Sequence, residues 1–173
     1  MMQSQYRAMH RLQLSPGKTE LLWCTTSRRQ NRLPTATLTV GSTTVSLLSP
    51  VSSICDLGIY VDSDLVMRTH VCQTVSRCFA ALRQLRSIRH LVSGPVFQWL
   101  VTALVLIRLD YGNGTLVGLP THLIRRLQSV QNAAARRSDH ITHALICLHW
   151  LPVPERIVFK VTMQTYRTLP LST

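Results

Sequence analysis

Acidic residues are scarce in this sequence. Of its 173 residues only 7 are Asp or Glu, against 19 Lys and Arg, so the formal net charge is +12. So few acids give no basis for a paired-carboxylate active site, and no Ser/His/Asp order points to nucleophilic catalysis. Lysine is nearly absent too, because only Lys18 and Lys160 occur. The charge is therefore almost all arginine, whose planar guanidinium can bond two phosphate oxygens at once.

The charge is also uneven along the chain. Residues 1–63 carry six cations and three acids, whereas residues 64–173 carry thirteen cations and four acids. We expect the partner of the second part to be a polyanion such as nucleic acid.

Long apolar runs are absent. The first eleven residues contain no apolar h-region, and the longest apolar run, residues 96–107, is interrupted by Gln98 and Thr102. A run of that length is shorter than the roughly 20 apolar residues that a membrane-spanning helix needs. The sequence therefore predicts no signal peptide and no membrane partner.

The cysteines show neither a C-x-x-C motif nor an even number. Three of the five lie within apolar patterns, which is typical of a reducing compartment. We expect an intracellular protein, nuclear or cytoplasmic. The five are Cys24, Cys55, Cys72, Cys78 and Cys147.

Residues 64–90 have the pattern of one long, basic, amphipathic helix around which the chain is organised. Its apolar positions recur at gaps of three and four residues, as in a helix that faces a core. They are Val71, Val75, Cys78, Leu82 and Leu85. Arg77, Arg83 and Arg86 fall off this stripe, and Arg89 lies in the last turn. The alternative interpretation is a solvated surface helix whose cations favour the negative end of the helix dipole.

Asp62-Ser63-Asp64, just before this apolar period, has two interpretations. Two acids close together are a candidate metal site. Acids and serine before a helix more often cap its free N–H groups. We therefore expect N-cap and first-turn residues here, and no metal site.

The first 63 residues suggest strands. We expect a strand at residues 21–24, a hairpin of residues 35–40 and 43–47 around Gly41-Ser42, and a third strand at residues 54–61. Gly17-Lys18-Thr19 resembles a phosphate loop, but that motif needs a glycine five residues earlier, where this chain has Leu12. We reject a nucleotide-binding loop.

The second part is predicted to be all-helical. Residues 96–109 are apolar nearly all round, which predicts a buried helix, and residues 110–114 break it. A helix from about Pro120 carries Leu123, Leu127, Val130 and Ala134 inward. A short helix at residues 139–149 and a last one at residues 155–166 follow. The fold class is therefore α+β, with domains at residues 1–63 and 64–173.

A zinc site is one interpretation of a His/Cys set late in the chain. Its first three members have helical spacing, and imidazole with thiolate is a plausible set of zinc ligands. No Cys/His pair elsewhere completes a known spacing, so we expect ordinary packing and no metal site. The set is His140, His143, Cys147 and His149.

Several blocks, in this order, resemble the downstream part of the reverse transcriptase of jockey-like, LINE-type non-long-terminal-repeat retrotransposons. The similarity extends from about Arg11 through nearly the whole chain. The blocks are Leu12-Gln13-Leu14 with Lys18-Thr19-Glu20, Asp56-Leu57-Gly58-Ile59-Tyr60-Val61-Asp62, Leu82-Arg83-Gln84-Leu85-Arg86-Ser87-Ile88-Arg89, Arg108-Leu109-Asp110-Tyr111-Gly112-Asn113, Leu127-Gln128-Ser129-Val130-Gln131-Asn132-Ala133-Ala134-Ala135-Arg136, Asp139-His140-Ile141-Thr142, Leu148-His149-Trp150-Leu151 and Pro154-Glu155-Arg156-Ile157.

This resemblance implies a palm remnant with a hairpin, followed by a mostly α-helical, thumb-like bundle. It implies that Lys18 lies near the incoming nucleotide's phosphates and that Leu57 and Gly58 form part of a hairpin that grips the primer end. The helices would hold a template–primer duplex by its backbone. The residues we expect at that duplex are Arg77, Arg83, Arg86, Arg89, Arg125 and Arg126.

The chain also departs from the family pattern. The metal-binding aspartates of the palm would lie upstream of Met1, and apolar residues of the family are missing between Arg136 and Asp139. Polymerisation needs two metal ions held by carboxylates. We therefore expect no catalytic residue and no cofactor here, with Mg²⁺ required only by a complete polymerase. Two alternatives remain: a decayed reading frame without specific activity, and a helical protein-interaction module.

Overall fold

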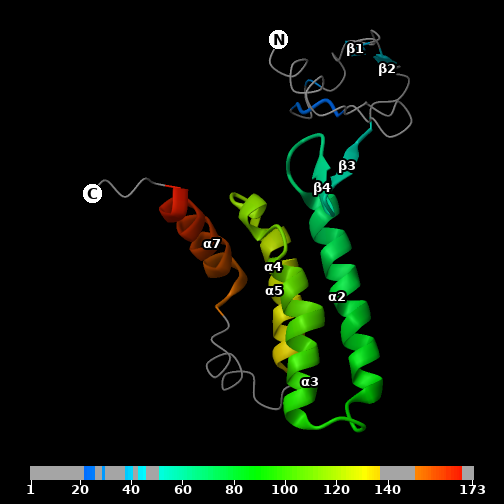
Figure 1. Cartoon of the computed structure of the whole chain (residues 1–173), viewed down its shortest axis with the longest axis vertical. Coiled ribbons are helices and arrows are strands. Elements are labelled where there is room, and N and C mark those ends of the chain that lie inside the picture. Colours follow the sequence, from blue (N-terminus) through cyan, green and yellow to red (C-terminus); the bar gives the residue numbers. More distant parts are fainter. Residues whose placement is uncertain are drawn as a thin grey trace, which may run out of the picture. The chain divides into compact units, whose positions relative to one another are not determined.

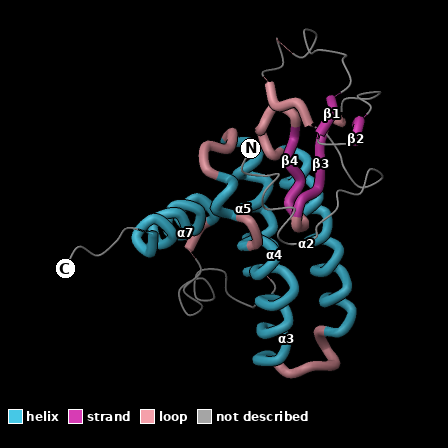
Figure 2. The backbone as a smooth tube through the Cα atoms, turned by 45° about the horizontal axis from the view of Figure 1, so that its top comes forward, coloured by secondary structure: helices cyan, strands magenta, loops and turns pink. Residues whose placement is uncertain are grey.

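The structure of the chain is a computed structural model that describes residues 22–25, 29, 38–40, 43–45, 51–136 and 151–168. The chain divides into two compact units between Leu65 and Val66, two residues after the predicted boundary. The described strands all belong to the first unit and the described helices to the second (Figure 2). The fold class is therefore α+β and mostly helical, as the sequence predicts.

Two antiparallel hairpins make up the described strands of the first unit. β1 (Leu38–Val40) pairs with β2 (Thr43–Val45) across Gly41-Ser42, so the predicted hairpin is confirmed. β3 (Ser53–Asp56) pairs with β4 (Ile59–Asp62).

The prediction of one continuous strand at residues 54–61 is wrong. Leu57 and Gly58 have φ angles of 46° and 82°, and two successive positive φ angles are typical of the two-residue turn that reverses a hairpin. The strand pattern missed this turn because leucine seldom adopts a positive φ, whereas the family resemblance implied a hairpin at Leu57 and Gly58. The expected strand near Trp23 is wrong as well: residues 22–25 are irregular, although Thr25 N–H donates to Ser63 O at 2.9 Å.

α2 (Arg68–Ile88) is the longest helix of the second unit, and it is shorter than the predicted span of residues 64–90. Met67 is its N-cap residue, with a φ of 58°, and makes no side-chain cap hydrogen bond. The prediction that Asp62, Ser63 and Asp64 occupy the N-cap and the first turn is therefore wrong, because the first turn begins at Arg68. Leu65 and Met67 both have a positive φ, so the chain turns between Asp64 and the helix.

The apolar stripe of α2 is buried, as its spacing predicts. The buried positions of the stripe are Val71, Val75, Cys78, Leu82 and Leu85. α2 and α3 (Gly94–Val101) lie side by side in opposite directions, joined by a short loop (Figure 1). α2 also packs against α5 (Thr121–Ala135), so it contributes one side of the core of the second unit.

The segment after α2 is not buried on all sides, and that prediction is wrong. α3 continues as a π-helical turn, η3 (Thr102–Leu106), and then as α4 (Ile107–Asp110). Phe97, Val101 and Val105 face the core, whereas Trp99 is 79% exposed and Ile107 is 62% exposed. A segment that is apolar at nearly every position has no period that marks an inner face. Only the packing therefore determines which side of the segment is buried.

The break predicted at residues 110–114 is confirmed. Gly112, with a φ of 70°, precedes the short 3₁₀ helix η4 (Asn113–Leu116). α5 then buries the four predicted positions, Leu123, Leu127, Val130 and Ala134. The last helix, α7 (Val153–Thr168), is slightly longer than predicted and packs against α5 and η4. The helix expected at residues 139–149 lies outside the described residues.

Candidate nucleic-acid interface

The arginines of α2 are exposed because the apolar stripe occupies only one side of the helix. Arg77, Arg83 and Arg86 are exposed, as is Arg89 immediately after the helix. At 100° per residue, Arg83 and Arg86 lie on one flank of the stripe and Arg77 on the other. The α2 arginines therefore belong to two surfaces.

Arg77 lies beside α4. The Arg108 guanidinium donates from Nη1 to the Arg77 carbonyl oxygen at 3.5 Å, so the Arg108 cation lies against the α2 backbone on this flank. Arg108 is exposed and was not among the residues predicted for the interface. Its position beside Arg77 depends on the packing of α4 against α2, which no local sequence pattern reveals.

The other predicted interface arginines of this region, Arg83, Arg86 and Arg89, lie at the C-terminal end of α2. Arg83, Arg86 and Arg89 follow each other at intervals of three residues, so they are neighbours on the helix surface. The guanidinium carbon of Arg89 lies 5.7 Å from the centre of the Phe97 ring, a cation–π contact that orients this arginine. We call Arg83, Arg86 and Arg89 the α2 basic end.

The arginines of α5 lie elsewhere. Arg125 and Arg126 are both exposed, and Arg126 Nη1 donates to Cys72 Sγ at 3.1 Å. Cys72 is in the first turns of α2, and Arg83 comes eleven residues later, about 16 Å along the axis. The predicted arginines thus form separate patches on the second unit.

The described part of the second unit is strongly basic. Residues 66–136 and 151–168 contain twelve Lys and Arg and only two acids, Asp110 and Glu155. Arg156 forms a two-point ion pair with Asp110: Nε donates to Oδ1 at 2.8 Å, and Nη2 contacts Oδ2. A surface with so few acids carries a positive potential that attracts polyanions.

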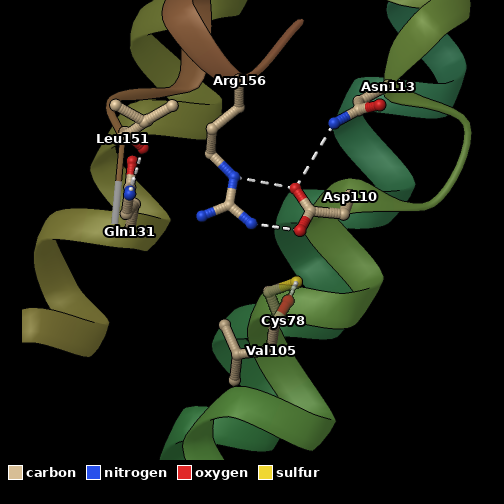
Figure 3. Close-up of polar contacts among 7 residues, drawn as sticks. All are labelled: Cys78, Val105, Asp110, Asn113, Gln131, Leu151 and Arg156. Carbon is tan, nitrogen blue, oxygen red and sulfur yellow. Dashed lines mark hydrogen bonds and ion pairs between the residues drawn. The ribbon is translucent and has the colours of Figure 1, made fainter. Parts of the chain in front are cut away.

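The ion pair belongs to a set of polar contacts that fixes α7 (Figure 3). Asn113 Nδ2 donates to Asp110 Oδ1 at 3.3 Å, and the buried Gln131 donates from Nε2 to Leu151 O at 2.8 Å. Sequence reasoning missed this arrangement because Asp110 and Arg156 are 46 residues apart. The only available signal was an isolated acid in a basic segment.

An open cavity of about 280 Å³ lies beside this ion pair. Its walls come from the end of α4, from η4 and from the first turns of α7. Both charged and apolar side chains line it. They are Asp110, Asn113, Leu151, Arg156, Phe159 and Lys160.

The remaining predicted site residues are in other places. Leu57 and Gly58 form the tip of the β3–β4 hairpin, where Leu57 is 82% exposed. Lys18 lies outside the described residues, as does the His140, His143, Cys147 and His149 set.

Within the described ranges, no three His, Cys, Asp or Glu side chains gather as metal ligands. No helix there has both the length and the apolar character to cross a membrane.

Comparisons of this chain with protein families, with curated proteins and with solved structures find no match.

Proposed function

We propose that this chain is the late-palm and thumb part of a retroelement RNA-directed DNA polymerase, and that its helical unit binds a template–primer duplex by the backbone. The family is suggested by the resemblance of the sequence blocks quoted above. Binding to the backbone is supported by the exposed arginines, since guanidinium groups suit phosphate oxygens. Contacts to phosphate hold a duplex in position without reading its sequence.

The observation that carries this proposal is the α2 basic end. Arg83 and Arg86 are exposed, and their side chains make no hydrogen bond or ion pair with any residue in the described part of the chain. Arg89, the third member, is oriented by Phe97. Arg83 and Arg86, one helical turn apart, can therefore contact phosphates without first breaking internal side-chain contacts.

The test is a salt titration on mixed-sequence duplex DNA. Each phosphate contact releases counterions, so affinity falls with salt at a slope of roughly 0.9 per contact. Replacing Arg83 and Arg86 by alanine should lower this slope by about two units, with helicity unchanged.

Two controls accompany this double variant. Gln73→Ala with Gln84→Ala removes exposed, uncharged side chains from the same helix, and the slope should stay the same. Arg83→Lys with Arg86→Lys keeps both charges and should keep most of the slope. An unchanged slope in the alanine variant would mean that these arginines only solvate the surface.

A second candidate function is a helical protein-interaction module. It is favoured by the exposed apolar stripe of α3 and α4, where Val96, Trp99 and Ile107 recur at gaps of three and eight residues. Under this candidate, sedimentation velocity shows concentration-dependent oligomers that Trp99→Ser removes. Under the first candidate, Trp99→Ser leaves the salt slope on duplex DNA unchanged.

A further inference from the structure

The outer surface of α7 combines exposed aromatic rings with exposed cations. Phe159 is 58% exposed and Tyr166 is 62% exposed. Seven residues separate them, so both rings lie on one side of the helix, about 10 Å apart along its axis. Lys160 and Arg167, each one residue further on, form a parallel row of two exposed cations.

The cavity beside the ion pair opens next to this surface. Phe159 and Lys160 both line it, together with the apolar side chain of Leu151. A planar ring stacked on Phe159 would have apolar contact on one side and a cation within reach. The cavity could therefore hold a nucleic-acid base next to the Lys160 cation.

Polar contacts on the inner side of α7 fix the position of its first turn. The Arg156–Asp110 ion pair ties α7 to α4, and Val153 N–H donates to Gln128 Oε1 of α5 at 2.8 Å. Val153 and Ile157 are buried on the inner side. An anchored helix loses little conformational freedom when a ligand binds, which preserves affinity.

We propose that Phe159, Lys160, Tyr166 and Arg167 form a binding surface for an unpaired nucleic-acid strand. Aromatic rings stack on unpaired bases, whereas the bases of an intact duplex are already stacked on each other. Lys160 and Arg167 neutralise the phosphates between the stacked bases. This surface is on a different helix from the α2 basic end, so either proposal can fail without the other.

One acid limits this surface. Glu155 is exposed and lies one turn before Phe159 on the same side of α7. Its negative charge repels phosphate, so the strand leaves the helix before reaching this turn. Removing this charge should therefore increase affinity: Glu155→Gln should tighten binding of a single strand.

The experiment measures fluorescence anisotropy of the full chain with labelled oligo(dT), oligo(U) and a hairpin duplex. Phe159→Leu keeps an apolar side chain but removes the ring, and it should weaken single-strand binding roughly 5- to 150-fold, the contribution of one stacked base. Phe159→Trp should retain the affinity. Val158→Ala, at an exposed neighbouring position without a ring, is the matched control. The DNA and RNA arms show which kind of strand is preferred.

Three results would overturn this proposal. One is equal affinity of the Leu and Trp variants for oligo(dT) and oligo(U). Another is equal loss of single-strand and duplex binding in Phe159→Leu when its urea unfolding matches that of the wild type, since Phe159 would then not distinguish unpaired bases from a duplex. The third is an unstructured acidic peptide that binds as tightly as oligo(dT) and is weakened equally by Phe159→Leu, since the surface would then be a general anionic docking face. Unfolding by urea, measured on each variant, separates loss of binding from loss of structure.

Discussion

The Cys78 thiol lies in the core, with none of its surface exposed. Its Sγ donates a weak hydrogen bond to the Val105 carbonyl oxygen at 3.8 Å, within the π-helical turn η3 (Figure 3). Burial raises the pKa of this thiol to about 11, and the positive charge of Arg108 offsets part of that increase. The thiol is therefore protonated and unreactive at neutral pH.

This pKa predicts how stability depends on pH. The folded pKa is above the ordinary value of 9.0, so the unfolded chain loses this proton first as pH rises. The contribution to stability is complete below pH 9 and is lost between pH 9 and 11, at about 1.4 kcal/mol per pH unit for this one group.

The measurement is urea unfolding between pH 8 and 11 on the wild type and on Cys78→Ala. Other groups titrate in both proteins, so the difference between the two curves isolates the thiol. The alanine variant should be less stable at pH 8, because it leaves a small cavity, but its stability should fall less steeply above pH 9. Parallel curves would contradict the raised pKa.

Among the elements, α7 depends most on distant contacts. Only Val153 and Ile157 of this helix are buried, so apolar packing alone holds it weakly. Its first residue, Val153, is fixed by Gln128 of α5, and its fourth residue, Arg156, is fixed by Asp110 of α4. Such a helix should open more easily than α2, whose stripe is fully buried.

Breaking the ion pair should loosen α7 selectively. Arg156→Met keeps the length of the side chain but removes the charge, and Asp110→Asn keeps the shape of the carboxyl group. Because both partners are partly exposed, we expect a coupling energy of only about 1 kcal/mol in a double-mutant cycle. Native-state hydrogen exchange should speed up in α7 and change little in α2. Uniform acceleration across the second unit would show that the pair stabilises the whole bundle.

At the scale of the whole molecule, the proposed function predicts that the chain alone has no polymerase activity. The full chain given primer–template, nucleotides and Mg²⁺ should extend no primer, because the matched blocks contain none of the carboxylates that hold two catalytic metal ions. The assay is primer extension on a denaturing gel, with an active reverse transcriptase as positive control. Extension that Asp62→Ala or Asp64→Ala abolishes would refute this prediction.

The sequence by itself determined the features that depend on local periodicity and composition. The stripes of α2 and α5, the β1–β2 hairpin and the break after Asp110 follow from spacings of two to four residues. The excess of arginine over acid is a matter of composition alone. Such signals are reliable because neighbours in sequence are also neighbours on the helix or strand.

Only the tertiary structure decided which surfaces face solvent and which side chains meet. The contact of Arg126 with Cys72 joins residues 54 apart, and the Asp110–Arg156 pair joins residues 46 apart. The uniformly apolar segment of α3 and α4 carried no period, so packing alone chose Phe97 for the core and left Trp99 exposed. Leu65 and Met67 have positive φ angles, and α2 begins at Arg68 rather than at the predicted residue 64. These features depend on contacts and backbone geometry that no short sequence window contains.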